Sequence, residues 1–231
     1  MIPSSPIAPS SPALLALVLG SLAVGRTRIA GLAETAELRT LAAALTAFGA
    51  TVIRQDDGAW TVDGVGIGGL GEPAAALDAG GSDLVLALLM GLAATHPLTA
   101  VFIGDATLSC RPLASLIQPL EIMGAQVTGR RGAQLPLAVT GAGLPMPLEH
   151  RLTASAPEIQ AAILLAALNT PGTSTVEAPD PLPAPVASLF TRFGARLSVT
   201  PGRVAIEGQP ELTPVSLDLP GDLSLALPSP A

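Results

Sequence analysis

The chain has 231 residues, of which 49% are hydrophobic and only 13% charged, so it can bury a sizeable core and lacks the composition of a disordered protein. Its formal net charge of −7, the absence of Tyr and the single Trp argue against a nucleic-acid partner, which requires clustered cations or stacking aromatic residues. One cysteine, Cys110, excludes an internal disulfide and a thiolate metal cluster. Two histidines are too few for most His-based metal sites, and we expect His96 and His150 to be surface residues.

The start of the chain contains an apolar run, residues 13–24, that has the length of the hydrophobic core of a signal peptide. No Lys or Arg precedes the run, whereas a secretory signal normally begins with positive charge. The run is also too short to span a bilayer, which takes roughly 20 residues. We therefore expect a flexible tail at residues 1–8, then a buried helix, and a cytoplasmic protein without a membrane partner.

Three copies of one unit follow along the chain. Each copy begins with an apolar run of helical length, at residues 13–23, 84–94 and 159–168. Because these runs are apolar on nearly every side, each predicts a helix that is buried all round. A turn and a β-prone stretch come next, at residues 26–32, 98–106 and 172–179.

A second, amphipathic helix then ends in the same way in each copy, with Phe or Met followed by Gly-Ala. The three glycines, Gly49, Gly124 and Gly194, suit the left-handed position that ends a helix, because glycine lacks a Cβ. Two short strands joined by a tight turn close each copy, within residues 51–66, 125–141 and 196–208.

The spacing of the copies predicts the fold class. The marker glycines are 75 and then 70 residues apart (124 − 49 and 194 − 124), which is long for a solenoid repeat. We therefore predict an α+β domain over residues 9–220, in which three βαβαββ repeats pack around buried helices. The expected repeats are residues 13–70, 77–143 and 151–211. Chance similarity among Ala- and Leu-rich helices is the alternative, and the recurrence of five elements in one order argues against it.

A glycine-rich stretch between the first two copies has a second interpretation. Gly66, Gly68 and Gly71 fit the GxGxxG spacing of a dinucleotide-binding loop. Pro73 and a strand-like stretch follow, however, instead of the helix that such a site needs. We interpret the stretch as a linker and expect no cofactor.

Three segments, residues 77–94, 101–127 and 161–179, carry a resemblance to a known family. In sequence and order they resemble the EPSP synthases (5-enolpyruvylshikimate-3-phosphate synthases), and the resemblance extends from about residue 9 to residue 222. It implies an enolpyruvyl transferase domain built from three βαβαββ units. It also implies a role in the shikimate pathway and aromatic amino acid biosynthesis, where the family transfers an enolpyruvyl group from phosphoenolpyruvate to shikimate 3-phosphate in a cleft between two domains.

The end of the chain also resembles part of this family. Gly221 and Asp222 match a glycine-aspartate pair near which the family crosses to its second domain, and the sequence stops nine residues later. We expect residues 221–231 to be a truncated crossing and the second domain, with its acid/base carboxylate and several cations, to be absent. A cleft with one wall has little means to exclude water or complete its site.

The first substrate-binding motif of the family is altered in this sequence. Transfer between two anionic substrates requires cations that neutralise and position them. Ser11 matches a family serine, but Ser10 stands where the resemblance expects a lysine and Leu15 where it expects an arginine. Neither residue can replace a positive charge.

The second motif, which precedes the second apolar run, is altered as well. Gly81 stands at an asparagine of the family, Asp83 and Leu84 at a glycine-threonine pair, and Ala87 at an arginine. We expect the carboxylate of Asp83 to repel the phosphate and carboxylate of phosphoenolpyruvate.

In the third repeat, the family's serine-(serine or alanine)-glutamine falls on Ala156, Pro157 and Glu158. A shift of one residue would restore a serine at Ser155, so that position stays open. Glu158 places a negative charge where the family has a neutral amide.

Arg111 is the exception, because it matches a family arginine that helps to hold phosphoenolpyruvate. Pro112 suits the first turn of the following helix, whose amides favour a nearby anion. The alternative is that Arg111 serves only as a loop or helix-start residue, since its partner cations are gone.

Three hypotheses about function follow. The chain is a member of the EPSP synthase lineage that is inactive on its own, a pseudoenzyme that at most binds either substrate weakly. Alternatively, it is one half of a split enolpyruvyl transferase that needs a second-domain protein partner. In the third, it is a non-catalytic binding or scaffold protein, and Leu15, Leu84 and Ala87 make the former cleft face apolar and favour self-association. Whether the chain is an enzyme stays open at this point.

Overall fold

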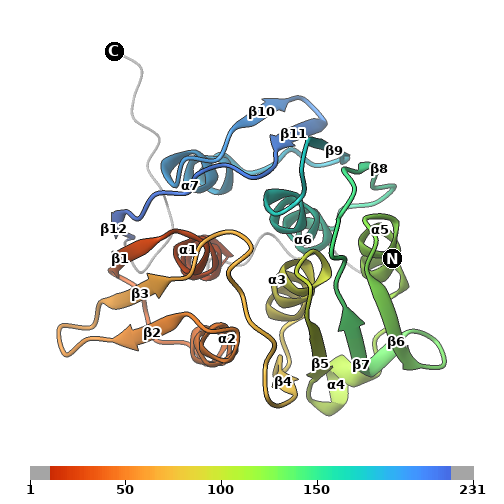
Figure 1. Ribbon diagram of the computed structural model, residues 1–231, viewed down its shortest axis with the longest axis horizontal. Helices are drawn as coiled ribbons and strands as arrows, with labels where there is room; N and C mark the ends of the chain where they lie inside the picture. Colours follow the sequence, from red (N-terminus) through yellow and green to blue (C-terminus); the bar gives the residue numbers. More distant parts are fainter. Residues whose placement is uncertain (1–10, 220–231) are drawn as a thin grey trace.

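The computed structural model describes residues 11–219, which form three four-stranded sheets around a group of buried helices (Figure 1). The first repeat contains α1 (Ser11–Leu22), β1 (Gly25–Ala30), α2 (Ala36–Ala47), β2 (Thr51–Arg54) and β3 (Trp60–Gly64). The second contains β4 (Leu77–Asp78), α3 (Asp83–Ala94), β5 (Thr99–Ile103), α4 (Ala106–Ser109), α5 (Ala114–Ile122), β6 (Gln126–Arg130) and β7 (Gln134–Thr140). The third contains β8 (Glu149–Arg151), α6 (Pro157–Leu168), β9 (Thr173–Glu177), α7 (Ala184–Arg192), β10 (Leu197–Thr200) and β11 (Arg203–Glu207), and β12 (Ser216–Asp218) follows.

The three sheets share one strand order. The orders are β12-β1-β3-β2, β4-β5-β7-β6 and β8-β9-β11-β10, with the first two strands of each sheet parallel and the others antiparallel. The second and third sheets, with their helices, are each one βαβαββ unit in chain order, and the first sheet has the same arrangement. The predicted α+β architecture is confirmed.

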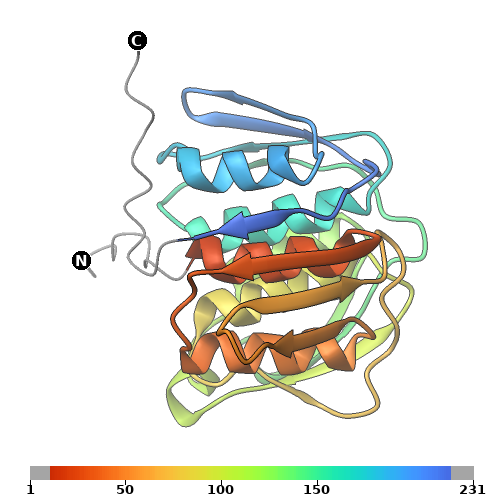
Figure 2. The same ribbon diagram turned by 90° about the vertical axis from the view of Figure 1, so that its left-hand side faces the viewer.

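The first sheet takes its leading strand from the far end of the described chain. β12 lies parallel to β1, with Arg28 opposite Ser216 and Ala30 opposite Asp218, as β4 lies beside β5 and β8 beside β9. Figure 2 shows β12 and β1 side by side. The sequence did not predict this strand, nor the short elements β8 and α4.

The buried core is formed by α1, α3 and α6, which Figure 1 shows end-on in the middle of the domain. Figure 1 also shows α2, α5 and α7 outside them, and each of the three contacts the central helix of the next repeat: α2 contacts α3, α5 contacts α6, and α7 contacts α1. The closest approach is between α3 and α6, since a Cβ at Gly91 would lie only 2.5 Å from the carbonyl oxygen of Ala162. Gly91 is therefore required for the spacing of these two helices.

The predicted helix-ending glycines are confirmed. Gly49, Gly124 and Gly194 have φ values of +106°, +111° and +95° directly after α2, α5 and α7. This left-handed conformation is accessible to glycine at little cost and directs the chain from each outer helix into its hairpin.

The prediction that His96 lies on the surface is wrong. It follows the buried helix α3 and is only 1% exposed, with Nδ1 2.7 Å from the carbonyl oxygen of Leu92. Burial lowers the pKa of His96, so that the neutral ring is favoured. His150, on β8, is half-buried, and its pKa is also lowered by burial.

Between residues 11 and 219, no helix combines the length and the apolar character needed to cross a membrane. The cytoplasmic location stays a prediction.

Candidate functional site

The candidate site lies where the central helices begin. The side-chain amide of Asn169, at the end of α6, donates to the carbonyl oxygen of Thr95, at the end of α3. Because their carboxyl ends meet, the two helices run parallel and both begin at the opposite face of the domain. The amino end of a helix carries partial positive charge, so this face favours anionic groups.

The loop before α3 is held by three carboxylates. Asp78 accepts a hydrogen bond from the amide of Gly80 (2.8 Å), and the hydroxyl of Ser82 donates to Glu37 on α2 (2.6 Å). The same hydroxyl caps α3 by accepting from the amide of Val85 (3.3 Å). A Cβ at Gly81 would lie 2.5 Å from Oδ2 of Asp105. At the position where the resemblance expects an asparagine, the third carboxylate therefore leaves no room for a side chain in this arrangement.

Arg111 lies after α4, on a backbone that is well anchored. Asp105 caps α4 by accepting from the amide of Leu108 (2.8 Å), and the amide of Arg111 donates to the carbonyl of Leu108 (3.1 Å). The preceding carbonyl, of Cys110, accepts from the side chain of Gln134 (2.8 Å). These hydrogen bonds fix the backbone from which the Arg111 side chain extends.

Arg111 and Asp83 form an ion pair, in which Nη1 and Oδ2 are 2.7 Å apart. The side chains are 53% and 35% exposed, so water reaches both partners. The sequence predicted that Asp83 would repel an anionic ligand, but it did not predict this pair, because Asp83 and Arg111 lie in different segments of the second repeat. The arginine that the resemblance assigns to the substrate site is thus paired with a carboxylate of the same chain.

The two positions at which the resemblance expects an arginine and the chain has an apolar residue are buried. Leu15 is 2% exposed and Ala87 is 0% exposed, because both face the packed interior of α1 and α3, whereas Leu84 is half-buried. The prediction that these residues make an apolar exposed face is therefore wrong for Leu15 and Ala87, and the argument for self-association through that face loses its basis.

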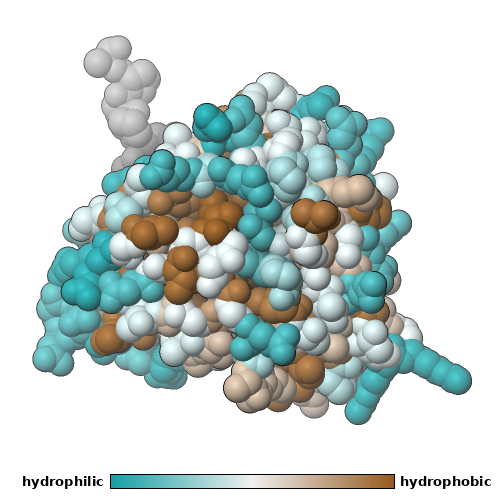
Figure 3. All heavy atoms as spheres, viewed as in Figure 1, coloured by the Kyte–Doolittle hydropathy of each residue, from teal (hydrophilic) through white to brown (hydrophobic). Residues whose placement is uncertain are grey.

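The large apolar side chains that are exposed lie elsewhere: Val24, Ile53, Val101, Ile103, Ile122, Leu144, Met146 and Val199. On the face drawn in Figure 3, hydrophobic patches are separated by white and teal residues. None of the residues in this list lies at the start of α1 or α3, and Figure 3 draws the face at which the central helices end.

The start of α6 has no side-chain cap. Ala156 occupies the cap position, Pro157 is the first residue of the helix, and Glu158 lies in its first turn. Ser155 is exposed and precedes the cap, and Glu158 is half-buried. Together with Asp83, Glu158 gives two of the central helices an acidic first turn, whose negative charge interacts favourably with the partial positive charge of the helix end.

The first family motif lies largely outside the described part of the chain. Ser10, Gly221 and Asp222 are outside residues 11–219, and Ser11 opens α1 with a side chain that is not described. The described site therefore rests on the second repeat and on the starts of α3 and α6.

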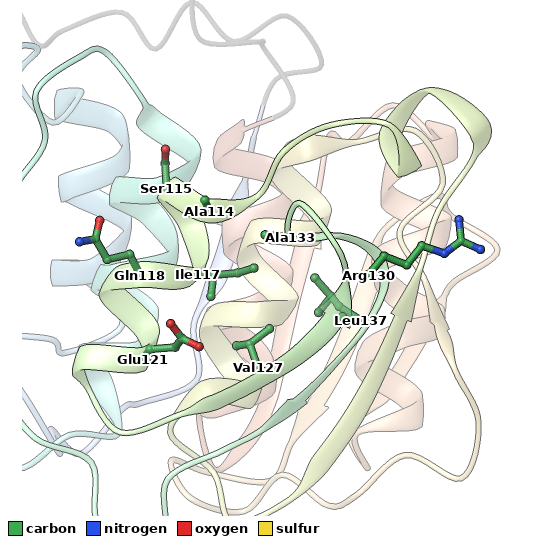
Figure 4. Close-up of a pocket in the computed structure, with 10 residues that line it drawn as sticks. Ala114, Ser115, Ile117, Gln118, Glu121, Val127, Arg130, Ala133 and Leu137 are labelled. Atoms are coloured by element: carbon green, nitrogen blue, oxygen red, sulfur yellow. The ribbon is translucent and has the colours of Figure 1, made fainter.

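A separate groove of about 510 Å³ lies between α5 and the hairpin of β6 and β7 (Figure 4). Ile117, Val127 and Leu137 form its apolar lining, and in Figure 4 the side chain of Arg130 points away from them. Arg111 does not line the groove, and no group of three or more His, Cys, Asp or Glu within residues 11–219 is arranged to hold a metal ion.

Comparison with known proteins adds independent evidence on the family. A family model described as EPSP synthase (3-phosphoshikimate 1-carboxyvinyltransferase) matches residues 6–228. The chain is 45% identical over 215 residues to the 3-phosphoshikimate 1-carboxyvinyltransferase of Novosphingobium aromaticivorans, covering 91% of this chain and 49% of that protein. It is 44% identical over 216 residues to the protein of the same name from Parvibaculum lavamentivorans, covering 91% and 48%.

Solved structures agree with these relatives. EPSP synthase from Acinetobacter baumannii matches with a TM-score of 0.86 and 27% identity, covering 90% of this chain and 47% of that one. The enolpyruvyl transferase NikO from Streptomyces tendae shares the fold, with a TM-score of 0.64 and 18% identity over 90% of this chain and 49% of that one. The chain spans about half the length of the relatives that it matches.

Proposed function

The chain belongs to the EPSP synthase family, and from this premise we propose that it forms one wall of an enolpyruvyl transferase cleft that no longer supports transfer. The reaction in question is the family's, from phosphoenolpyruvate to shikimate 3-phosphate. On this proposal the chain is a pseudoenzyme, or a non-catalytic half of an enzyme, because of the residues that it carries itself.

The observation that carries the proposal is the burial of Leu15 and Ala87, at 2% and 0% exposed. The resemblance expects an arginine at each position, and charge neutralisation by such cations is a large part of catalysis on two anionic substrates. A buried aliphatic side chain cannot supply a cation, and a partner domain that binds from the other side of the cleft cannot restore one to this wall.

Enolpyruvyl transfer is tested by measuring formation of the product from both substrates. The samples are the chain alone and the chain mixed with a separately produced second half of the Novosphingobium aromaticivorans relative. The matched control is that relative's own first half with the same second half. We expect turnover in the control and none above the no-protein background in either sample.

Each other result has a distinct meaning. Turnover by the chain alone contradicts the proposal outright. Turnover only in the mixed sample also contradicts it, and supports the alternative that the chain is one half of a split enolpyruvyl transferase.

A further inference from the structure

We propose that Asp83 is an internal counter-ion, which occupies Arg111 in place of a small phosphate- or carboxylate-bearing ligand and keeps this anion site closed. The inference rests on the proposed function in one respect: it takes Arg111 as part of the cleft wall. It adds the identity of the group that blocks the site and the means to reopen it.

Asp83 is held in the blocking position from the side of the helix. It is the first residue of α3, where the partial positive charge of the helix end favours a carboxylate. The residue before it, Ser82, is fixed twice, by its cap on Val85 and by its hydrogen bond to Glu37. The Asp83 carboxylate is therefore presented to Arg111 by a defined backbone.

Arg111 is held from the opposite side by two hydrogen bonds of the backbone. Its own amide donates to the carbonyl of Leu108, and the carbonyl of Cys110 accepts from the side chain of Gln134. The contact of 2.7 Å thus joins two anchored segments, and one nitrogen of the guanidinium is paired with a carboxylate of the same chain. An anion that approaches Arg111 must displace Asp83. Two further carboxylates add negative charge to the loop before α3: Asp105 lies against Gly81, and Glu37 lies beside Ser82.

The exposure of the pair sets the size of the effect. Because the side chains are 53% and 35% exposed, water and salt weaken their attraction. Asp83 is therefore a competitor of an anionic ligand for Arg111 that a substitution can remove. The pair is not a buried salt bridge whose loss would disrupt the fold. Removal of the carboxylate should therefore uncover anion affinity while the domain stays folded.

The test compares Asp83→Asn with the unaltered chain, at low ionic strength, with inorganic phosphate and phosphoenolpyruvate as probes. Binding is followed by NMR titration of the arginine Nε–H signals and by calorimetry. We expect Asp83→Asn to bind phosphate about five-fold more tightly, because an exposed ion pair is a competitor of roughly this strength.

Asp57→Asn is the matched control, because Asp57 forms an exposed ion pair of 2.6 Å with Arg28 in the first repeat. It removes the same charge from the protein without touching Arg111, so we expect no gain in affinity at the Arg111 Nε–H signal, and an anion bound by the released Arg28 is seen at that arginine's own signal. The double variant Asp83→Asn, Arg111→Ala should lose the gain. Thermal unfolding of each variant shows that it is folded.

Three results overturn the inference: equal affinity in Asp83→Asn and the unaltered chain, an equal gain at the Arg111 signal in Asp57→Asn, or a gain that survives the loss of Arg111. None of them depends on turnover. Enolpyruvyl transfer by the chain would refute the proposed function and leave this comparison of affinities to be judged by itself.

Discussion

The amino and carboxyl ends of α3 differ in burial and in the contacts that they make. At the carboxyl end, His96 is 1% exposed and hydrogen-bonded to the carbonyl of Leu92, and the carbonyl of Thr95 accepts from Asn169 at the end of α6. At its start, Asp83 is partly exposed and contacts a solvent-accessible arginine. The end is therefore part of the packing that holds the repeats together, whereas the start is open to substitution without loss of the fold.

This difference agrees with the proposal that the chain keeps the family's architecture while residues at its candidate site are substituted. Packing at the helix ends involves backbone atoms at van der Waals distance, which leaves little tolerance for change. Polar groups at an exposed helix start interact through water, and each interaction is worth little to stability. The predictions that follow test this contrast, from the largest expected effect to the smallest.

The largest effect is expected at Gly141, beside the end of α3. A Cβ at this position would lie 2.1 Å from the carbonyl oxygens of both Ala93 and His96. Because backbone atoms cannot move aside cheaply, Gly141→Ala should lower the free energy of unfolding by about 3 kcal/mol, measured by urea titration.

Gly143 provides the control for this prediction, since a Cβ there meets nothing within 4 Å. Gly143→Ala should change stability by less than about 0.5 kcal/mol. Equal losses in the two variants would contradict the importance of the contact at Gly141.

A smaller effect is expected for Asn169→Ala. The substitution removes the hydrogen bond to the carbonyl of Thr95, a link between the ends of α6 and α3. The loss should be about 1–2 kcal/mol, since a poorly solvated carbonyl is left without its donor. Calorimetric unfolding measures this, and a stability unchanged from that of the unaltered chain would show that the link is dispensable.

Acid should weaken the same region through His96. Burial lowers its pKa in the folded state, whereas the unfolded chain has a pKa of about 6.5. The stability that the neutral His96 ring contributes is fully present above about pH 6.5. It is lost as the pH falls from there toward the lower folded pKa, because the unfolded chain binds a proton at His96 more readily than the folded chain does.

Unfolding measured between about pH 7 and pH 5 should therefore show a decline that is reduced in His96→Gln. Part of the decline should remain in that variant, because burial also lowers the pKa of His150. An identical decline in the variant and the unaltered chain would rule out His96 as a source.

The smallest effect on stability is expected for Asp83→Asn at the start of α3. An exposed ion pair and a helix-end charge together contribute less than about 1 kcal/mol. A loss comparable to that of Gly141→Ala would contradict the contrast between the two ends of the helix. Thermal unfolding of both variants in one buffer makes the comparison.

Much of the fold was predictable from local patterns. The apolar runs at residues 84–94 and 159–168 became α3 and α6 almost residue for residue, because a stretch that is apolar on all sides must be buried. The glycines at 49, 124 and 194 were identified because a left-handed residue is needed to end each helix. The match of Asp83 and Arg111 to family site positions stays a prediction.

The sequence by itself determined the repeat, the α+β class, the three central helices and the residue types at the candidate site, since all of these follow from local periodicity and from substitutions at matched positions. Only the tertiary structure decided that β12 completes the first sheet, that His96 is buried, and that Asp83 contacts Arg111. Each of these depends on segments distant in the chain that come together only when three repeats close around one core, and contacts of that kind leave no local pattern in the sequence.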